Sequence, residues 1–233
     1  MLLAIDTATR YASIALYDDA GIVAEQSWRS ENNHSVEVMP AIERLLSLQQ
    51  LSPEDLTALA VAQGPGSFTG LRIGMSIAKG FCLALDIPII AIPTLDSVVY
   101  AAGDPGGPII AVLEAGRGRL SVARYHFEDG LPVQDGDVEL VPANRWEPEP
   151  DEPVLITGEV NADLADRLMT LPDAENISIS CLAASLRRAG YLAELAWERL
   201  QEGAVDDLDA LSPIYTYPPT SGTADASGAC VTL

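Results

Sequence analysis

The sequence predicts an α/β protein of two lobes, each a mixed sheet with flanking helices, and three observations support this. Short apolar runs of strand character alternate with segments whose apolar residues recur at helical spacing. This succession occurs twice along the 233 residues, the second time in a degraded form. A cluster of turn-forming residues at 103–108 separates the two halves. The length suits one large or two compact units.

The first half begins with a predicted antiparallel meander. Residues 2–5, 12–17 and 22–28 read as strands, and the turn-like residues 18–21 connect the last two. The spacing of apolar residues then predicts a helix over 35–50, capped by Asn33 or Ser35. Pro40 is expected either to kink its first turns or to mark its true start.

A strand at 56–62, a glycine-rich loop at 63–70, a helix at 71–85 and a strand at 87–92 complete the first half. A meander followed by strands that alternate with helices is typical of actin-like, ribonuclease-H-like half-domains. The first lobe is therefore assigned to residues 1–102.

The second half repeats this rhythm and is assigned to residues 103–217. A mobile tail is expected at 218–233, where no periodicity remains. The expected strands cover 109–113, 120–127, 133–141 and 154–157, and the expected helices cover 162–169 and 182–201.

Composition limits the classes of function. Thirteen basic against 34 acidic residues give a net charge of −21, which repels phosphate backbones unless an arginine patch or a basic partner intervenes. Such a surface also fits adaptation to a salty cytoplasm. No apolar run approaches the roughly 20 residues of a membrane span, and no secretory signal is readable, so we expect a cytoplasmic protein. Three cysteines and two distant histidines predict no metal site.

The glycine-rich segment 64–74 allows two interpretations. Gly66, Ser67 and Thr69 could contribute to a phosphate cradle at a helix N-terminus, although the lysine of a Walker motif is missing. Alternatively, small residues spaced four apart form ridges that let another element approach closely. We favour the ridges, which are Gly70, Gly74 and Ala78 in one row and Ser76, Gly80 and Ala84 in the other.

The turn after the first strand also allows two interpretations. Asp6, Thr7 and Thr9 stand where actin-like ATPases place a metal-orienting aspartate and a phosphate-contacting turn. The same side chains could instead satisfy local backbone donors. The residues alone leave both interpretations open.

Three sequence features resemble the TsaB family of tRNA threonylcarbamoyladenosine biosynthesis proteins. These are Ile5-Asp6-Thr7-Ala8-Thr9, the helix start at His34-Ser35, and above all the run Gly64-Pro65-Gly66-Ser67-Phe68-Thr69-Gly70-Leu71-Arg72-Ile73-Gly74. The resemblance covers about the first hundred residues and continues more loosely to Tyr215. In two places the chain departs from the family pattern, at Glu114-Ala115-Gly116-Arg117 and at Thr216-Tyr217.

The resemblance implies a non-catalytic subunit with two actin-like lobes. Its partner TsaD would perform the transfer of threonylcarbamoyl to the adenosine next to the anticodon, in tRNAs that read codons beginning with A. The ATPase TsaE would join that pair, ATP and metal would belong to the partners, and tRNA would be reached only through the complex. A homodimer through the same helices would compete with the heterodimer.

Carried onto this chain, the resemblance places the partner interface on the two helices of the first lobe. The alternative function is either an ATP-dependent enzyme, which would use Asp6 and Thr9, or a metallopeptidase of the same fold class. The expected interface residues are His34, Val38, Met39, Ile42, Leu46, Gly70, Arg72, Ile73, Gly74, Ile77, Ala78 and Phe81.

Overall fold

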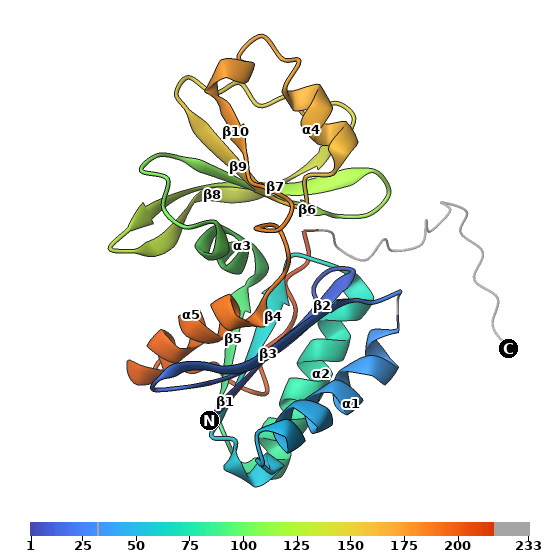
Figure 1. Cartoon of the computed structure of the whole chain (residues 1–233), viewed down its shortest axis with the longest axis vertical. Coiled ribbons are helices and arrows are strands. Elements are labelled where there is room, and N and C mark those ends of the chain that lie inside the picture. The colour runs from blue at the N-terminus through green and yellow to red at the C-terminus, as the bar shows by residue number, and fades with distance from the viewer. Residues whose placement is uncertain (32, 217–233) are drawn as a thin grey trace, which may run out of the picture.

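A computed structural model describes residues 1–31 and 33–216, and the tail expected at 218–233 lies outside these described residues. Two five-stranded sheets lie one above the other along the long axis of the molecule, with helices around and between them (Figure 1). This arrangement confirms the predicted fold class.

The first sheet has the order β3-β2-β1-β4-β5. The strand β1 is antiparallel to β2 and parallel to β4, so the sheet is mixed as predicted. The meander continues from β2 to β3 in antiparallel register, and β4 pairs with β5 in parallel. The strands are β1 (Leu2–Asp6), β2 (Tyr11–Asp18), β3 (Gly21–Arg29), β4 (Ala58–Gly64) and β5 (Ile89–Pro93).

The second sheet has the order β10-β9-β6-β7-β8, which repeats the connectivity of the first sheet strand for strand. The central strand β6 is again antiparallel to its successor β7 and parallel to β9. The repetition confirms that the second half copies the first. The strands are β6 (Ile109–Glu114), β7 (Arg119–Glu128), β8 (Leu131–Pro142), β9 (Val154–Gly158) and β10 (Ile177–Ile179).

Helices cover both faces of the first sheet. Alternate residues of a strand point to opposite faces, so Leu3 and Ile5 of β1 face one way while Leu2 and Ala4 face the other. The helices α1 (His34–Leu48) and α2 (Phe68–Leu85) cover the Leu3 side, and α5 (Ala189–Gln201) covers the Leu2 side. The α5 side is rich in alanine on both partners, which lets helix and sheet approach closely.

The second sheet is covered in the same way by α3 (Thr94–Ala102) and α4 (Ala162–Leu168). Leu95 and Val99 of α3 pack with Tyr125 on one face, and Leu164 and Leu168 of α4 pack on the other. Figure 1 shows α3 lying between the two sheets. Short 3₁₀ turns occur at Pro53–Asp55 and Ala174–Asn176.

Two helices differ from the sequence expectation in a way that changes the assignment of the lobes. The helix α3 was not predicted, and it belongs to the segment 1–102 yet packs against the second sheet. The helix α5 belongs to the segment 103–217 yet packs against the first sheet. The boundary at 102–103 thus divides the two sheets but not the helices that cover them.

The starts of three helices also differ from expectation. The helix α1 begins at His34 and contains Pro40, so the proline does not mark its start, and Asn33 occupies the cap position without a side-chain cap bond. The helix α2 begins three residues earlier than predicted because the Ser67 hydroxyl accepts a bond from the Gly70 amide, at 3.2 Å. The helix α5 begins at 189 instead of 182.

The helix α2 also has the length and mean hydropathy of a membrane span, the only such helix in the described part of the chain. A single helix of this kind is weak evidence, because core helices pass the same test. Here α2 packs on the first sheet beside α1, which accounts for the apolar residues on its buried side, a third of the helix.

Candidate functional site

The turn after β1 is closed by a buried ion pair. Asp6 and Arg187 are almost completely buried, and the guanidinium donates from both Nε, at 2.9 Å, and Nη2 to the same carboxylate oxygen of Asp6. The other carboxylate oxygen accepts from the Ala8 amide at 3.0 Å, and Arg187 also donates to the Thr94 carbonyl at 3.2 Å. Asp6 is therefore occupied by a cation supplied by the chain itself.

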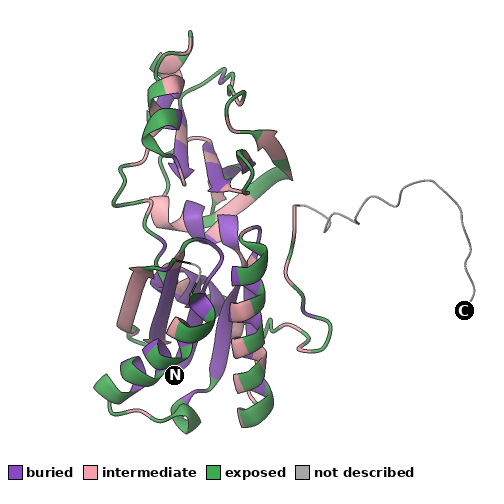
Figure 2. Cartoon of the chain, turned by 90° about the vertical axis from the view of Figure 1, so that its right-hand side faces the viewer, coloured by how far each residue is buried: buried purple, intermediate pink, exposed green. Residues whose placement is uncertain are grey.

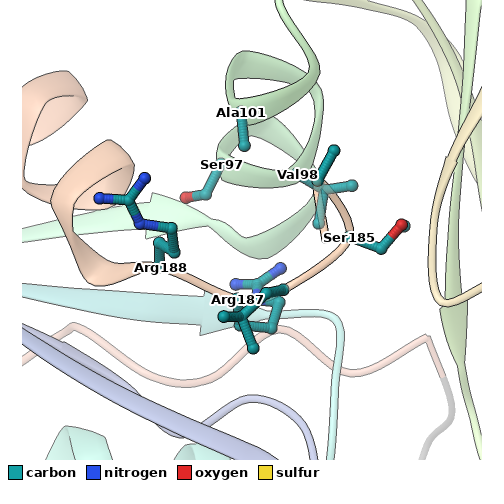
Figure 3. A pocket seen from close by; sticks show the side chains of 9 residues that line it. Ser97, Val98, Ala101, Ser185, Arg187 and Arg188 are labelled. Carbon is teal, nitrogen blue, oxygen red and sulfur yellow. The ribbon is translucent and has the colours of Figure 1, made fainter. Parts of the chain in front are cut away.

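A small cavity adjoins Arg187 on the side of α3, and none of the predicted nucleotide contacts lines it. Figure 3 shows the cavity next to Arg187, between α3 and the segment that leads into α5. Its volume is about 10 Å³, enough for about one water molecule. The hydroxyl of Ser97, which lines it, is buried and has no hydrogen-bond partner among the described residues.

The glycine-rich loop packs directly on the same turn. A Cβ atom at Gly66 would overlap the Ala8 carbonyl oxygen, and one at Gly70 would overlap that of Thr7. The Ser67 amide donates to the Ala8 carbonyl at 2.6 Å, and the Thr7 hydroxyl donates to the Gly70 carbonyl at 2.8 Å. Two amides that a phosphate cradle would need, those of Ser67 and Gly70, are thus bonded within the chain.

The sequence-predicted nucleotide contacts therefore have structural roles in this geometry. Asp6, Thr7 and Thr9 are buried, and Thr9 accepts at its carbonyl from the Nε2–H of His34, at 3.0 Å. Gly66 is partly buried against the turn, whereas Ser67 and Thr69 are exposed. Asp6 and Thr9 each accept from a local backbone donor, the Ala8 amide and, at 3.2 Å, the Tyr11 amide, whereas the Thr7 hydroxyl donates to the Gly70 carbonyl 63 residues away.

A second ion pair joins the lobes at the mouth of the turn. Arg10 lies between β1 and β2 and contacts the carboxylate of Glu114, the last residue of β6. The Glu159 carboxylate accepts from the Glu114 amide at 2.8 Å. Burial raises the pKa of the Glu159 carboxyl group, although that amide bond opposes the shift. The pair of Arg10 and Glu114 thus links the turn after β1 to the end of β6 in the second sheet.

The helix pair shows which of the expected interface residues can reach a partner. Five of them are exposed or partly exposed, and we keep these: Met39, Arg72, Ile73, Ile77 and Phe81. The others are buried against their own lobe and cannot form a contact surface, which corrects the expectation. The buried residues are His34, Val38, Ile42, Leu46, Gly70, Gly74 and Ala78.

The two rows of small residues on α2 face in opposite directions. The row of Gly74 packs inward, where a Cβ atom would overlap the Thr7 hydroxyl oxygen, whereas a Cβ atom at Gly80 would meet no atom within 4 Å. Figure 2 shows exposed residues along the helices of the first lobe over buried strands. We call the accessible set the outer helix face; it comprises Val36, Met39, Leu48, Phe68, Arg72, Ile73, Ser76, Ile77, Gly80, Phe81, Leu83 and Ala84.

An arginine in contact with two aromatic side chains lies at the N-terminal end of the outer helix face. The guanidinium of Arg72 lies 3.9 Å from the ring centroid of Phe68, and its Nε donates to the Tyr215 hydroxyl at 2.9 Å. The two rings lie 4.9 Å apart between centroids. The segment that carries Tyr215 is fixed to β4, because the Ile214 amide donates to the Gln63 carbonyl at 2.8 Å. Phe68 and Tyr215 were missed as candidates because no spacing pattern connects them.

Residues 10–134 match a protein family described as tRNA N6-adenosine threonylcarbamoyltransferase, TsaD. Over 160 residues the chain is 38% identical to the tRNA threonylcarbamoyladenosine biosynthesis protein TsaB of Bacillus subtilis, covering 67% of this chain and 70% of that protein. The chain belongs to the TsaB family. Its match to the TsaB protein of Escherichia coli is 35% identical over 130 residues, covering 55% of this chain and 56% of that protein.

A solved structure supports the fold independently. The structure titled YeaZ from Pseudomonas aeruginosa superposes with a TM-score of 0.76 at 23% sequence identity, covering 92% of this chain and 98% of that one. At this identity the likeness supports the fold alone. It extends through both sheets, so the two-lobe architecture is shared beyond the segment that the sequence matches cover.

The described residues contain no cluster of side chains that could bind a metal ion. Across 1–31 and 33–216, no group of three or more histidine, cysteine, aspartate or glutamate side chains is placed to hold an ion. The Nε2–H of His34 donates to the Thr9 carbonyl. On the surface of β7, the Nδ1 atom of His126 lies 2.9 Å from the Asp135 carboxylate.

Proposed function

We propose that this chain is the non-catalytic subunit of a tRNA threonylcarbamoyltransferase complex, in which the outer helix face docks the transferase TsaD. TsaE joins this pair in the cytoplasm, and the partners supply ATP and metal. The adenosine beside the anticodon is modified in tRNAs that read codons beginning with A, and tRNA is contacted through the complex. Membership of the TsaB family supports this proposal.

One structural observation carries the proposal: α2 has an open row of small residues between large apolar side chains. Ser76, Gly80 and Ala84 are exposed, and Leu83 beside them is 71% exposed. Such a notch lets the backbone of a partner helix approach while the larger apolar side chains are covered. Large exposed apolar side chains gathered on one helix pair are typical of an interaction surface.

The physical effect of docking is to bury this apolar face. A standard interface removes about 800 Å² from solvent on each partner, and its energy is concentrated in a few central aromatic, arginine and apolar residues. Phe68, Arg72 and Phe81 fit that composition. A homodimer through the same face would compete with the heterodimer, and protein concentration would decide which predominates.

The enzymatic alternatives gain no supporting observation. An ATP-dependent enzyme using Asp6 would need that carboxylate for a metal, but Arg187 holds it.

The test is the variant Gly80→Leu, which fills the notch. Its matched control is Ala162→Leu, which adds a leucine at an exposed position of α4 in the other lobe. Complex formation with purified cognate TsaD is measured by size-exclusion chromatography with light scattering and by calorimetry. We expect Gly80→Leu to weaken the complex by at least about tenfold and Ala162→Leu to leave it unchanged, because only the first blocks close helix approach.

Thermal unfolding of the same variants separates docking from folding. A leucine at Gly80 has open space and a better helix propensity than glycine, by up to about 1 kcal/mol, so the variant should be as stable as the parent or more stable. A stable Gly80→Leu variant that binds TsaD as tightly as the parent would overturn the proposed surface.

A further inference from the structure

A second candidate site lies in the other lobe, at the end of its sheet. A cavity of about 560 Å³ is formed by the loop between β6 and β7, the residues after β8 and the start of α4. This volume lies within the range of about 300 to 1,000 Å³ that is usual for small-molecule sites. The cavity is lined by residues different from those around Arg187, so it is separate from the closed turn described above.

Three arginines converge on this cavity, in a protein that has 13 basic and 34 acidic residues. They are Arg117, Arg119 and Arg167. Two acidic residues, Glu114 and Asp163, also line it, but the carboxylate of Glu114 is held by Arg10. The cavity is thus a local positive site on a strongly negative molecule.

Of the three arginines, Arg117 is the one available to an added anion. Arg167 is held by the chain: it donates from Nη1 to the Trp146 carbonyl at 2.7 Å and from Nη2 to the Ala143 carbonyl, and Nη1 lies 3.9 Å from the Glu147 carboxylate. Arg117 is exposed and forms no hydrogen bond or ion pair with any residue in 1–31 or 33–216, although acidic side chains are abundant. Its backbone φ of +53°, between Gly116 and Gly118 at +71° and +69°, holds it at the tip of a tight loop.

The remaining walls suit a ring system. Leu120 and Leu164 supply apolar surface, and the side chains of Asn144 and Asn161 supply amides. The side-chain oxygen Oδ1 of Asn161 accepts from the Leu164 amide at 2.9 Å, which leaves the side-chain NH₂ group of Asn161 for a ligand. Arginine forks bind phosphate oxygens with strong charge-assisted bonds, while bases prefer apolar walls with a few amide partners.

From these features we infer that the cavity binds a phosphorylated nucleoside, with the phosphate on Arg117 and the base against Leu120 and Leu164. The nucleoside phosphate is either a free nucleotide or one nucleotide of an RNA strand. This inference does not depend on docking of the outer helix face to TsaD.

The experiment uses the full chain and four probes: AMP, ADP, inorganic phosphate and a fluorescently labelled single-stranded RNA of about six nucleotides. Calorimetry follows the small probes, and anisotropy follows the RNA at several salt concentrations. The variant is Arg117→Gln, which removes an exposed charge that forms no hydrogen bond or ion pair with any residue in 1–31 or 33–216. The control is Arg124→Gln on the same sheet, whose side chain pairs with Glu152 at 2.9 Å outside the cavity.

We expect AMP to bind and Arg117→Gln to weaken it at least about tenfold, with Arg124→Gln unchanged. Tighter binding of AMP or ADP than of RNA would identify a free nucleotide, and tighter, strongly salt-dependent binding of RNA would identify a strand. The inference is overturned if no nucleotide or RNA binds at millimolar concentration. It is equally overturned if inorganic phosphate binds as well as AMP, or if both variants behave alike. Unchanged circular dichroism of both variants ensures that a loss reports on the site.

Discussion

Gly74 packs its Cα against the turn after β1, and replacing it with alanine tests the inward row of α2. The added methyl group would overlap the Thr7 hydroxyl oxygen and would lie 3.7 Å from Ile5. That hydroxyl donates to the Gly70 carbonyl at 2.8 Å, so it cannot rotate away without losing its bond. Either the helix moves outward or the hydrogen bond breaks.

The magnitude follows from three opposing effects. Overpacking a buried contact costs about 1 to 3 kcal/mol, and losing the Thr7 bond costs about 1 kcal/mol. The better helix propensity of alanine returns up to about 1 kcal/mol. We therefore expect Gly74→Ala to lower the free energy of unfolding by about 1 to 3 kcal/mol, which is about 3 to 10 °C in Tm for a chain of this length.

Gly80→Ala is the matched comparison, because it makes the same chemical change on the same helix. Its Cβ atom meets nothing within 4 Å, so only the gain in helix propensity remains and stability should rise by up to about 1 kcal/mol. Urea unfolding followed by far-ultraviolet circular dichroism gives both free energies. If both variants changed the free energy of unfolding in the same direction, the assignment of one row to the inside and the other to the outside of α2 would be refuted.

A double-mutant cycle locates the clash. Thr7→Ala removes the hydroxyl that a methyl group at Gly74 would meet, so Gly74→Ala should cost at least about 1 kcal/mol less in that background. If the two changes in the free energy of unfolding add to within about 0.5 kcal/mol, the Thr7 hydroxyl is not the group that the added methyl clashes with.

Two further predictions concern buried charges. Burial raises the pKa of Asp96 to about 6, so the folded chain binds this proton more tightly than the unfolded chain does. The free energy of unfolding of the parent therefore falls as pH rises from about 4 to about 6. Over that interval Asp96→Asn should gain about 1 to 3 kcal/mol of stability relative to the parent, measured by urea unfolding. A difference between the two proteins that does not change with pH would contradict this. Arg187→Met strands the Asp6 carboxylate in the interior and should cost about 3 to 5 kcal/mol, part of which Asp6→Asn restores; a cost below about 1 kcal/mol would contradict the buried pair.

The meander of the first sheet and the presence of buried strands after it were predictable because both depend on local patterns. Alternation in β2 and β3 marks a meander, and the apolar runs of β4 and β5 mark buried parallel strands. The helix α3 was missed because it follows β5 without a break, and Pro93 at its cap position gives no side-chain signal.

The start of α5 was unpredictable because its caps come from distant strands. The Ala189 amide donates to the Ser13 hydroxyl and the Gly190 amide to the Glu25 carboxylate, both at 2.8 Å. Arg188, just before the helix, also pairs with Glu25. These contacts hold the preceding residues out of the helix, and no spacing within 182–201 reveals them.

The candidate interface was half predictable for a similar reason. Spacing identified two rows of small residues on α2, but rows four residues apart look alike until the helix is placed on a sheet. The Thr7 hydroxyl decides which row packs inward. The pair of Asp6 and Arg187, separated by 181 residues, likewise has no local signature.

The exchange of α3 and α5 between the two sheets makes the halves interlocked. A polypeptide cut within 103–108 would leave the first sheet without its alanine-lined cover and the second without the helix that shields Tyr125. Neither piece would be self-sufficient, yet the two retain matching surfaces. Mixed together, they should reassemble by fragment complementation, and the intact molecule should melt in a single cooperative step.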